Sequence, residues 1–169
     1  MTAFLADLDM FYLGTSNAEG QPYIQYRGGP KGFLKVLDKN RLAFADFSGN
    51  AQYISVGNLD DNNKAFIFLM DYTNRRRIKV WGNAKYVEDD PQLLQRLTDD
   101  EYGGRVERAI VFHIHAWDVN CPQHIKPRFT EEDLGPMVEQ YQRRISKLEA
   151  EVHQLRQSQV GHNVEMTHD

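Results

Sequence analysis

The sequence predicts a mainly β fold, in which short antiparallel strands close into a barrel and a long helix follows at the C-terminus. Two observations indicate the barrel: short apolar segments follow one another at close spacing, and turn-forming residues separate them. A third observation indicates the helix, because apolar residues recur at spacings of three and four after Pro127. We therefore expect a barrel domain at 1–126, an amphipathic or coiled-coil helix at 127–160 and a flexible tail at 161–169.

Composition and charge narrow the possible partners and location of this 169-residue chain. Its net charge of −4 does not indicate a general nucleic-acid surface. The single cysteine, Cys121, excludes an intrachain disulfide and suits a reducing compartment. No apolar run approaches the roughly 20 residues of a membrane span, and the N-terminus lacks a signal-peptide pattern. We expect a cytoplasmic protein with neither a nucleic acid nor a membrane as partner.

The strands are expected wherever an apolar-rich segment lies between turn signals. The turn 17–20 joins the first two segments, and the tight polar break 38–40 joins the next two. Residues 65–70 form a continuous apolar run, which is typical of a strand buried on both faces. Strands are expected at 10–15, 21–26, 33–37, 41–47, 65–70, 75–87 and 109–117.

Short helices are expected before and between these strands. Residues 2–8 could form a helical turn that covers one end of the barrel. Residues 52–59 could form a second helix, ended by the polar run 60–63. The sequence Asp89-Asp90-Pro91 opens a third, because proline is favoured in the first turn of a helix.

The C-terminal segment carries a heptad pattern. Thr130 precedes Asp133 by three residues, which is a variant of the capping box that begins helices. The apolar stripe of such a helix needs a partner, since an isolated helix of this length is marginal in water. It could lie on its own barrel, or it could form a coiled coil or helix pair with another subunit. The apolar positions are Leu134, Val138, Tyr141, Ile145, Leu148, Val152 and Leu155.

Two loops that flank strands of the first half could bind an anion. The loop 27–32 places Arg27 and Lys31 among three glycines. The loop 48–52 places hydroxyl, amide and backbone N–H groups before a helix, where the helix dipole favours an anion. Both loops also have simpler interpretations: a hairpin connection that needs positive φ, and an ordinary helix N-cap.

A basic run on a later strand is the third candidate feature. Alternation along the strand puts Arg75, Arg77 and Lys79 on one face. Three cations beside a barrel core are costly unless they meet an anion or water. The simpler interpretation is a solvated strand edge, because charge also protects edges from pairing with other strands.

The order of these segments resembles the pyridoxamine 5′-phosphate oxidase-like family, whose fold is an FMN-binding split barrel. The similarity covers about 11–118. The segment 27–58, together with the polar segment 120–125 that contains Gln123, is similar to a bacterial subgroup of oxidase-related flavoproteins. The fold that the resemblance implies is an antiparallel six-stranded split β-barrel with short helices and a long C-terminal helix. The residues that carry it are Arg27 with 28–35, then 42–50 (LAFADFSGN) and 76–82 (RRIKVWG).

The resemblance implies that FMN binds at the subunit interface of a homodimer. Arg27 and Lys31 would face the phosphate or the pyrimidine edge of the flavin, and Arg77 would lie beside the isoalloxazine. Such a site needs counter-charge for the phosphate, a donor near N1–C2=O and an apolar wall. The cofactor-binding residues implied in this way are Arg27, Gly28, Lys31, Asp46, Phe47, Ser48, Asn50, Gln52, Arg77, Lys79 and Gln123.

The function implied is that of an FMN-dependent oxidoreductase, with hydride passing between FMN and a small-molecule substrate or a nicotinamide cofactor. The sequence identifies no catalytic residue. Where the family carries a basic pair, this chain reads Ala51-Gln52, and the substrate-binding arginine motif of the true oxidase is not recognisable. Two alternatives remain: a non-catalytic flavin-binding or sensing module, and a haem-handling split barrel. His113 and His115 share a strand face, but no metal-ligand set completes them.

Overall fold

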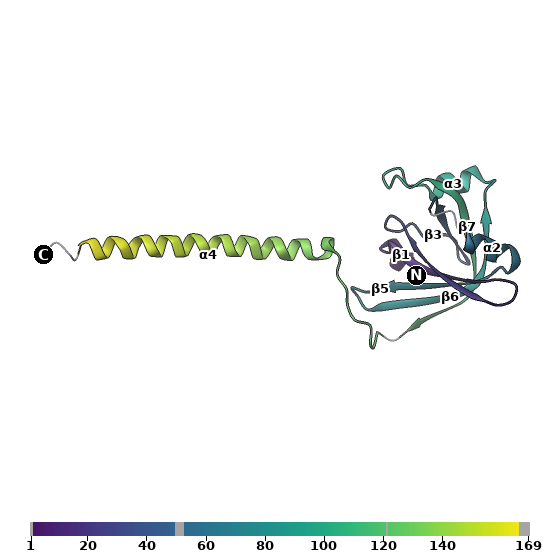
Figure 1. The fold of residues 1–169 in the computed structure, drawn as a ribbon, viewed down its shortest axis with the longest axis horizontal. Coiled ribbons are helices and arrows are strands. Elements are labelled where there is room, and N and C mark those ends of the chain that lie inside the picture. Colours follow the sequence, from purple (N-terminus) through teal and green to yellow (C-terminus); the bar gives the residue numbers. More distant parts are fainter. Residues whose placement is uncertain (1, 50–52, 121, 166–169) are drawn as a thin grey trace. The chain divides into compact units, whose positions relative to one another are not determined.

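The computed structural model describes residues 2–49, 53–120 and 122–165, and its strands form one antiparallel sheet (Figure 1). The strand order is β2-β1-β5-β6-β7-β4-β3, so each strand pairs with a neighbour that runs in the opposite direction. The strands are β1 (Met10–Ser16), β2 (Pro22–Gly28), β3 (Lys35–Asp38), β4 (Arg41–Phe47), β5 (Lys64–Asp71), β6 (Arg76–Val87) and β7 (Val106–Asn120).

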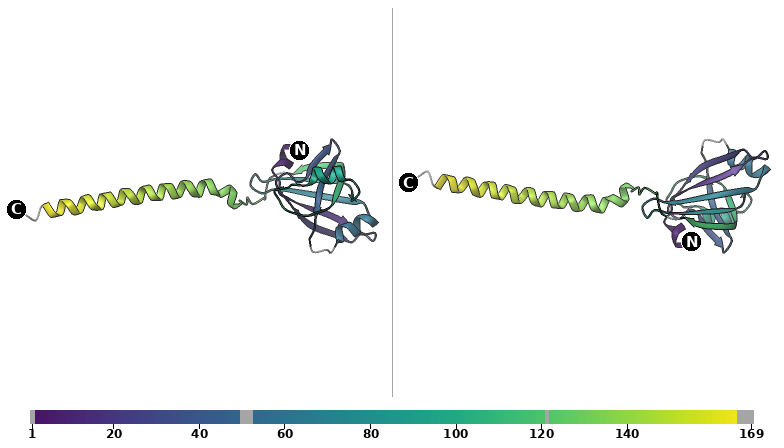
Figure 2. Two further views of the ribbon diagram at one scale, coloured as in Figure 1. Left: turned by 90° about the horizontal axis from the view of Figure 1, so that it is seen from above. Right: turned by 90° about the horizontal axis from the view of Figure 1, so that it is seen from below.

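The fold is mainly β and antiparallel, as the sequence predicts, but the expected six-stranded closed barrel is not confirmed. The sheet has seven strands, and no hydrogen-bonded pairing joins its two edge strands, β2 and β3, within the described residues. The reason lies in β3, which has only four residues and pairs with β4 through a register shift between Val36 and Asp38. The sheet curls strongly, as the views in Figure 2 show, without closing on itself.

The core fills the concave side of the sheet and is built on aromatic rings. Strand β1 alternates between buried and half-buried residues, which is the pattern of a strand with one face on a core. The buried Phe11 ring of β1 lies 5.4 Å from Phe33 and 4.9 Å from Phe44, measured between ring centroids. Each such side chain contributes roughly 1.5–3 kcal/mol through burial. Phe11 belongs to β1, Phe44 to β4 and Phe33 to the loop between β2 and β3, so these rings pack the inner faces of β1 and β4 together.

The short helices lie at the connections between strands. Helix α3 begins as predicted, with Pro91 in its first turn and the Asp90 side chain accepting a hydrogen bond from the backbone N–H of Leu93 at 2.9 Å. Helix α2 begins at Ile54, two residues later than expected, after Tyr53 in the left-handed region with φ 51°. None of the helices among the described residues could span a membrane. The helices are α1 (Thr2–Ala6), α2 (Ile54–Asp61), α3 (Pro91–Leu97) and α4 (Glu131–Glu165).

The chain divides into two compact units, Met1–Pro127 and Arg128–Asp169. The second unit is dominated by α4, and the predicted capping box at its start is confirmed. The backbone N–H of Thr130 donates to Asp133 Oδ2 at 2.9 Å, and the N–H of Asp133 donates to Thr130 Oγ1 at 3.1 Å. Helix α4 therefore has a defined beginning of its own.

Candidate functional site

A small polar cavity of about 50 Å³ lies between β2, β4, β7 and the start of α2. Arg27 reaches it from β2, because its partner in the register is Phe11 of β1, whose side chain points into the core. Directly opposed residues of antiparallel strands share a face, so Arg27 is held on the concave side. Asp46 and Phe47 line the cavity from β4. Residues from strands that are distant in the sequence therefore meet at the cavity.

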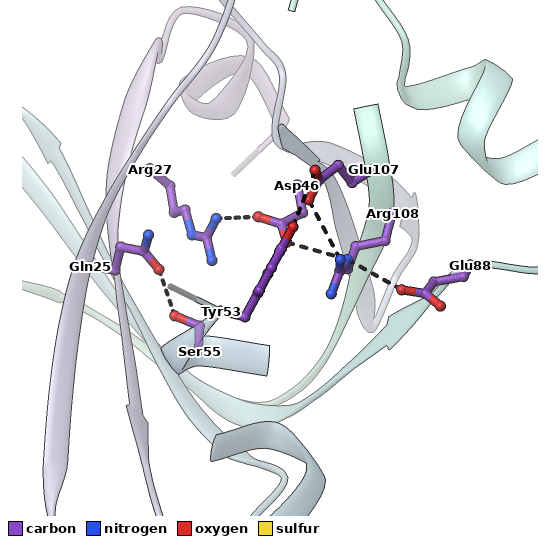
Figure 3. Close-up of polar contacts among 8 residues, drawn as sticks. All are labelled: Gln25, Arg27, Asp46, Tyr53, Ser55, Glu88, Glu107 and Arg108. Carbon is purple, nitrogen blue, oxygen red and sulfur yellow. Dashed lines mark hydrogen bonds and ion pairs between the residues drawn. The ribbon is translucent and has the colours of Figure 1, made fainter. Parts of the chain in front are cut away.

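Arg27 and Asp46 form a largely buried ion pair, shown in Figure 3. Their side chains are 12% and 8% exposed, so each charge depends on the other for compensation. The guanidinium also lies 5.9 Å from the ring centroid of Phe44. Its Nε is buried and has no hydrogen-bond partner among the described residues. Arg27 therefore keeps one donor available beside the cavity.

A second arginine, Arg108 of β7, lies on the other side of Asp46 (Figure 3). Its Nε is 3.8 Å from Asp46 Oδ2 and 3.4 Å from Glu88 Oε1, and an Nη is 3.5 Å from Glu107 Oε2. The guanidinium also packs on the ring of Tyr53, 4.9 Å from its centroid. Arg108 is not among the site residues expected from the sequence. Its spacing from Ile110 and Phe112, both fully buried, was the available signal that it faces the core side.

Helix α2 is fixed to the cavity by its first residues. Ser55 is buried, and its hydroxyl donates to Gln25 Oε1 of β2 at 2.7 Å. The Tyr53 hydroxyl donates to Glu107 Oε1 at 3.4 Å. These bonds tie the start of the helix to β2 and β7, as Figure 3 shows. The cavity wall is thus a connected polar network rather than a set of independent side chains.

The cations of this network are matched by acidic groups of the same chain. Two arginines, Arg27 and Arg108, face the carboxylates of Asp46, Glu88 and Glu107. Nearby, a hydrogen bond to Asp60 raises the pKa of Tyr86, whose ring lies 5.8 Å from the Arg108 guanidinium. An anion entering the cavity would have to share an arginine that already has a carboxylate partner.

The residues named from the sequence fall into separate places. Arg27, Asp46 and Phe47 lie together at the cavity. Ser48 is exposed, and its backbone N–H donates to the carbonyl of Arg105 at 2.9 Å. Gln123 is exposed beyond the end of β7. Asn50 and Gln52 lie outside the described residues.

The loop after β2 is bound to the N-terminal segment. Gly28 ends β2 opposite Met10, and Lys31 is exposed in the loop that follows. The N–H of Gly29 donates to the carbonyl of Asp9 at 2.9 Å, and the N–H of Gly32 to that of Leu8 at 2.8 Å. These two N–H groups are therefore committed within the chain. Gly32 has φ 71°, which is the positive φ that a hairpin connection requires.

Arg77 and Lys79 lie on the convex face of the sheet, away from the cavity. Lys79 is 3.5 Å from Asp118 Oδ2 and 5.5 Å from the ring centroid of Trp81. Arg77 stands opposite Met70 of β5, and its Nε is buried without a hydrogen-bond partner among the described residues. A single chain therefore does not bring these two cations to Arg27.

The convex face also carries a row of apolar side chains, which we call the outer aromatic face. Tyr12 and Tyr26 are 6.0 Å apart, and Phe66 and Trp81 are 5.2 Å apart, between ring centroids. Trp81 is 42% exposed, which is unusual for so large an apolar side chain. Ile24 and Tyr26 are exposed as well, while Tyr12, Phe66 and Phe68 are half-buried. Large exposed apolar patches are typical of interaction surfaces. The face comprises Tyr12, Ile24, Tyr26, Phe66, Phe68 and Trp81.

Comparison with known proteins gives one family match. A family model described as "Pyridoxamine 5'-phosphate oxidase" matches residues 1–121. No curated protein matches the sequence. In the part of the chain that the structure describes, no group of three His, Cys, Asp or Glu residues could hold a metal ion.

Solved structures with the same fold come from several bacteria. HupZ of Group A Streptococcus is 15% identical with a TM-score of 0.59, covering 76% of this chain and 96% of that one. A protein from Clostridium acetobutylicum related to general stress protein 26 is 16% identical with a TM-score of 0.54, covering 73% and 86%. An FMN-binding protein from Syntrophomonas wolfei subsp. wolfei is 13% identical with a TM-score of 0.53, covering 70% and 81%. At these identities the likeness establishes the fold.

Proposed function

The chain belongs to the pyridoxamine 5′-phosphate oxidase family, and on that premise we propose that it is a cytoplasmic FMN-binding flavoprotein that acts as a homodimer. The reaction we propose is hydride transfer between FMN and a small substrate or a nicotinamide cofactor. The observation that carries the proposal is Arg27, a largely buried cation beside a polar cavity, with a free Nε donor. A fold neighbour described as an FMN-binding protein lends further support.

The residues present fit the phosphate end of FMN. An arginine has five N–H donors, so Arg27 can keep its bond to Asp46 through one Nη and still offer Nε to an anion. Charge-assisted hydrogen bonds from a guanidinium to a phosphate are the strong type. Ser55 and Tyr53 add hydroxyl groups to the same wall. FMN, when bound, would supply the hydride chemistry, and the protein would bind and orient it.

The ring system of FMN needs more space than this cavity offers. Ligand pockets usually enclose about 300–1,000 Å³, whereas the cavity measures about 50 Å³. A site completed by a second subunit would resolve this difference. The outer aromatic face supports dimerisation as such, because it offers apolar side chains to a partner, but it lies on the other face of the sheet from the cavity.

The test compares FMN with riboflavin, which lacks the phosphate. We expect the double variant Arg27→Gln/Asp46→Asn, which removes both charges together, to weaken FMN binding about tenfold or more, while riboflavin changes less than about twofold. Binding is followed by quenching of flavin fluorescence. The matched control is Arg41→Gln/Asp38→Asn, which neutralises an exposed ion pair of 2.6 Å in the β3–β4 hairpin. That control should leave both affinities unchanged.

Four outcomes would count against the proposal. A flavin spectrum that stays that of free FMN at saturating protein would refute FMN binding. Equal losses of FMN and riboflavin affinity would remove Arg27 from the phosphate site. A Soret band on mixing with haem, without any flavin shift, would favour the haem-handling alternative. Flavin that binds but is not reduced by a nicotinamide cofactor would favour the non-catalytic module.

A further inference from the structure

We propose that α4 pairs with α4 of a second copy of this chain, as a parallel, two-stranded coiled coil in register. The spacing of the apolar residues by itself leaves the partner, the orientation and the number of strands open. Three features of the described helix decide them: the exposure of its apolar seam, the residue types at the seam positions, and the charges beside the seam. None of the three involves the flavin site.

From Val138 to Leu155 the seam side chains of α4 are exposed to solvent in the single chain, whereas Leu134 is half-buried. The exposed fractions run from 41% for Leu148 to 64% for Leu155. An isolated helix with such a stripe gains nothing from its apolar residues, and most helical stability in proteins comes from packing of that stripe. The seam repeats every 3.5 residues on average, which is the period of a left-handed coiled coil. The stripe therefore fits another helix.

The residue types at the seam favour two parallel strands. With Val138 as the first a position, the a positions hold Val138, Ile145 and Val152, all of them β-branched. The d positions hold leucine at Leu148 and Leu155, with Tyr141 before them. β-Branched residues at a with leucine at d favour parallel dimers over trimers and tetramers.

The charges beside the seam complement each other between two parallel copies. In this geometry a g residue of one helix faces the e residue five positions later in the other. Arg144 then faces the partner's Glu149, and Glu151 faces the partner's Arg156. By symmetry the dimer contains each of these pairs twice, which gives four attractive contacts. Every charged g residue from 144 to 151 thus meets the opposite sign.

These charges are not fully used inside one helix. Two ion pairs within the described part of α4 are Glu139–Arg143 at 3.4 Å and Lys147–Glu151 at 3.9 Å. In the described part of α4, neither Arg144 nor Glu149 has an ion-pair partner in its own chain. Their placement on either side of the seam is explained by a second helix.

An antiparallel pair satisfies the same residues less well. With the seam aligned at its centre, Arg144 would face the partner's Glu151, which gives two attractive contacts. Glu149 would then face the partner's Gln142 and lose its ionic partner. A parallel coil also has a two-fold axis along its length, which a homodimer of the N-terminal unit can share. The parallel form is therefore the one we infer.

Cysteine cross-linking of the full chain tests the orientation. On a Cys121→Ser background, Leu155→Cys places a thiol at a d position near one end of the seam. In a parallel coil the two thiols meet across the axis, within the 4.4–6.8 Å between Cα atoms that a disulfide spans. We expect most of the oxidised chain to run as a disulfide-linked dimer that a reductant converts to monomer. The control Ala150→Cys, on the outer side of the helix, should give little dimer.

Charge reversal tests the pairing. We expect Arg144→Glu to lower the equilibrium fraction of Leu155→Cys dimer about three- to tenfold in a glutathione buffer, because two attractive contacts become repulsive. Adding Glu149→Arg should restore it. In an antiparallel coil Leu155→Cys would not pair with itself, and Glu151→Arg would instead restore the disulfide between Val138→Cys and Leu155→Cys chains that both carry Arg144→Glu.

Several results would overturn the inference. A disulfide that forms only between Val138→Cys and Leu155→Cys chains, mixed as two species, would show an antiparallel pair. An absence of any seam-specific disulfide would show that the stripe packs elsewhere, on its own barrel or on another protein. FMN titration of the same variants keeps the two proposals separate: cross-linking without FMN binding refutes only the proposed function, and FMN binding without cross-linking refutes only the coiled coil.

Discussion

At the scale of single residues, Asp71 shows how hydrogen bonds can outweigh burial. Burial by itself raises the pKa of this carboxyl group at the end of β5. Hydrogen bonds from the backbone and side chain of Asn74 and from Arg76 oppose it, and their sum lowers the pKa below its ordinary value. The donors lie close, at 2.9 Å for the Asn74 N–H and 2.8 Å for an Arg76 Nη. The carboxylate thus closes the β5–β6 hairpin.

This lowered pKa gives a pH-dependent contribution to stability. A carboxyl group with a depressed folded-state pKa stabilises the protein above its unfolded-state pKa, and the contribution is lost as the pH falls through the folded-state pKa. We expect Asp71→Asn to reduce the free energy of unfolding by about 1–2 kcal/mol at pH 7 and by progressively less as the pH falls below the ordinary Asp pKa of about 3.9. Urea unfolding at pH 7 and at a series of acidic pH values measures the difference. Asp100→Asn, an exposed turn residue, is the control.

The site shows which residues could be recognised from the sequence. Arg27 could be named because a cation before a glycine-rich loop is a local pattern. Its partner Asp46 was named only through the family resemblance, because their pairing across β2 and β4 depends on the curl of the sheet. Arg108 was missed although its strand spacing placed it on the core side. The burial of a cation such as Arg108 cannot be predicted from the sequence until the carboxylates that compensate its charge are known.

At the scale of elements, Gly82 marks the point where β6 changes its register with β7. The register shifts between Trp81 and Gly82. A Cβ atom on Gly82 would lie 1.9 Å from the carbonyl oxygen of His113, so the two strands would have to separate. We expect Gly82→Ala to destabilise the protein by about 3 kcal/mol or more, as seen in tryptophan fluorescence during thermal unfolding.

A matched glycine in open space provides the comparison. Gly57 lies inside α2, and a Cβ there would meet nothing within 4 Å. Gly57→Ala should leave stability unchanged or raise it by up to about 1 kcal/mol, because alanine is the better helix former. Similar losses for both variants would show that close strand contact at Gly82 is not the cause.

The sequence predicted the elements better than their connections. Apolar runs and turn signals placed every strand of the sheet, and Pro91 placed the start of α3. The later start of α2 was not predictable, because it depends on Tyr53 adopting a left-handed conformation that its own type does not favour. The open sheet was also not predictable from the sequence. Closure depends on whether the two edge strands meet, and no local sequence pattern encodes that contact.

At the scale of the whole molecule, two separate surfaces are proposed to hold the dimer together: the outer aromatic face and the seam of α4. Each surface lies in its own compact unit. If both contacts form between the same two chains, loss of one leaves the other to hold the pair at raised effective concentration. The dimer should then come apart only when both are lost.

Sedimentation of two single variants and their combination tests this arrangement. Trp81→Glu places a charge in the outer aromatic face, and Ile145→Lys places one in the seam. We expect each single variant to remain dimeric at micromolar concentration and the double variant to be monomeric. Trp117 lies opposite Val80 and therefore on the other face of the sheet from Trp81. Trp117→Glu is the control for the effect of replacing a tryptophan by a charged residue outside the outer aromatic face. A monomeric Ile145→Lys variant would show that the N-terminal unit does not dimerise.

The unclosed sheet has one more consequence, which concerns behaviour in concentrated solution. Two strand borders, β2 and β3, have only one neighbour each within the described residues, so their outer backbone groups could recruit foreign chains. Pro22 opens one border, and the other is four residues long with a register irregularity. Borders of this kind are poor templates for fibril growth. The sheet can therefore stay open between β2 and β3 without polymerising at these two borders.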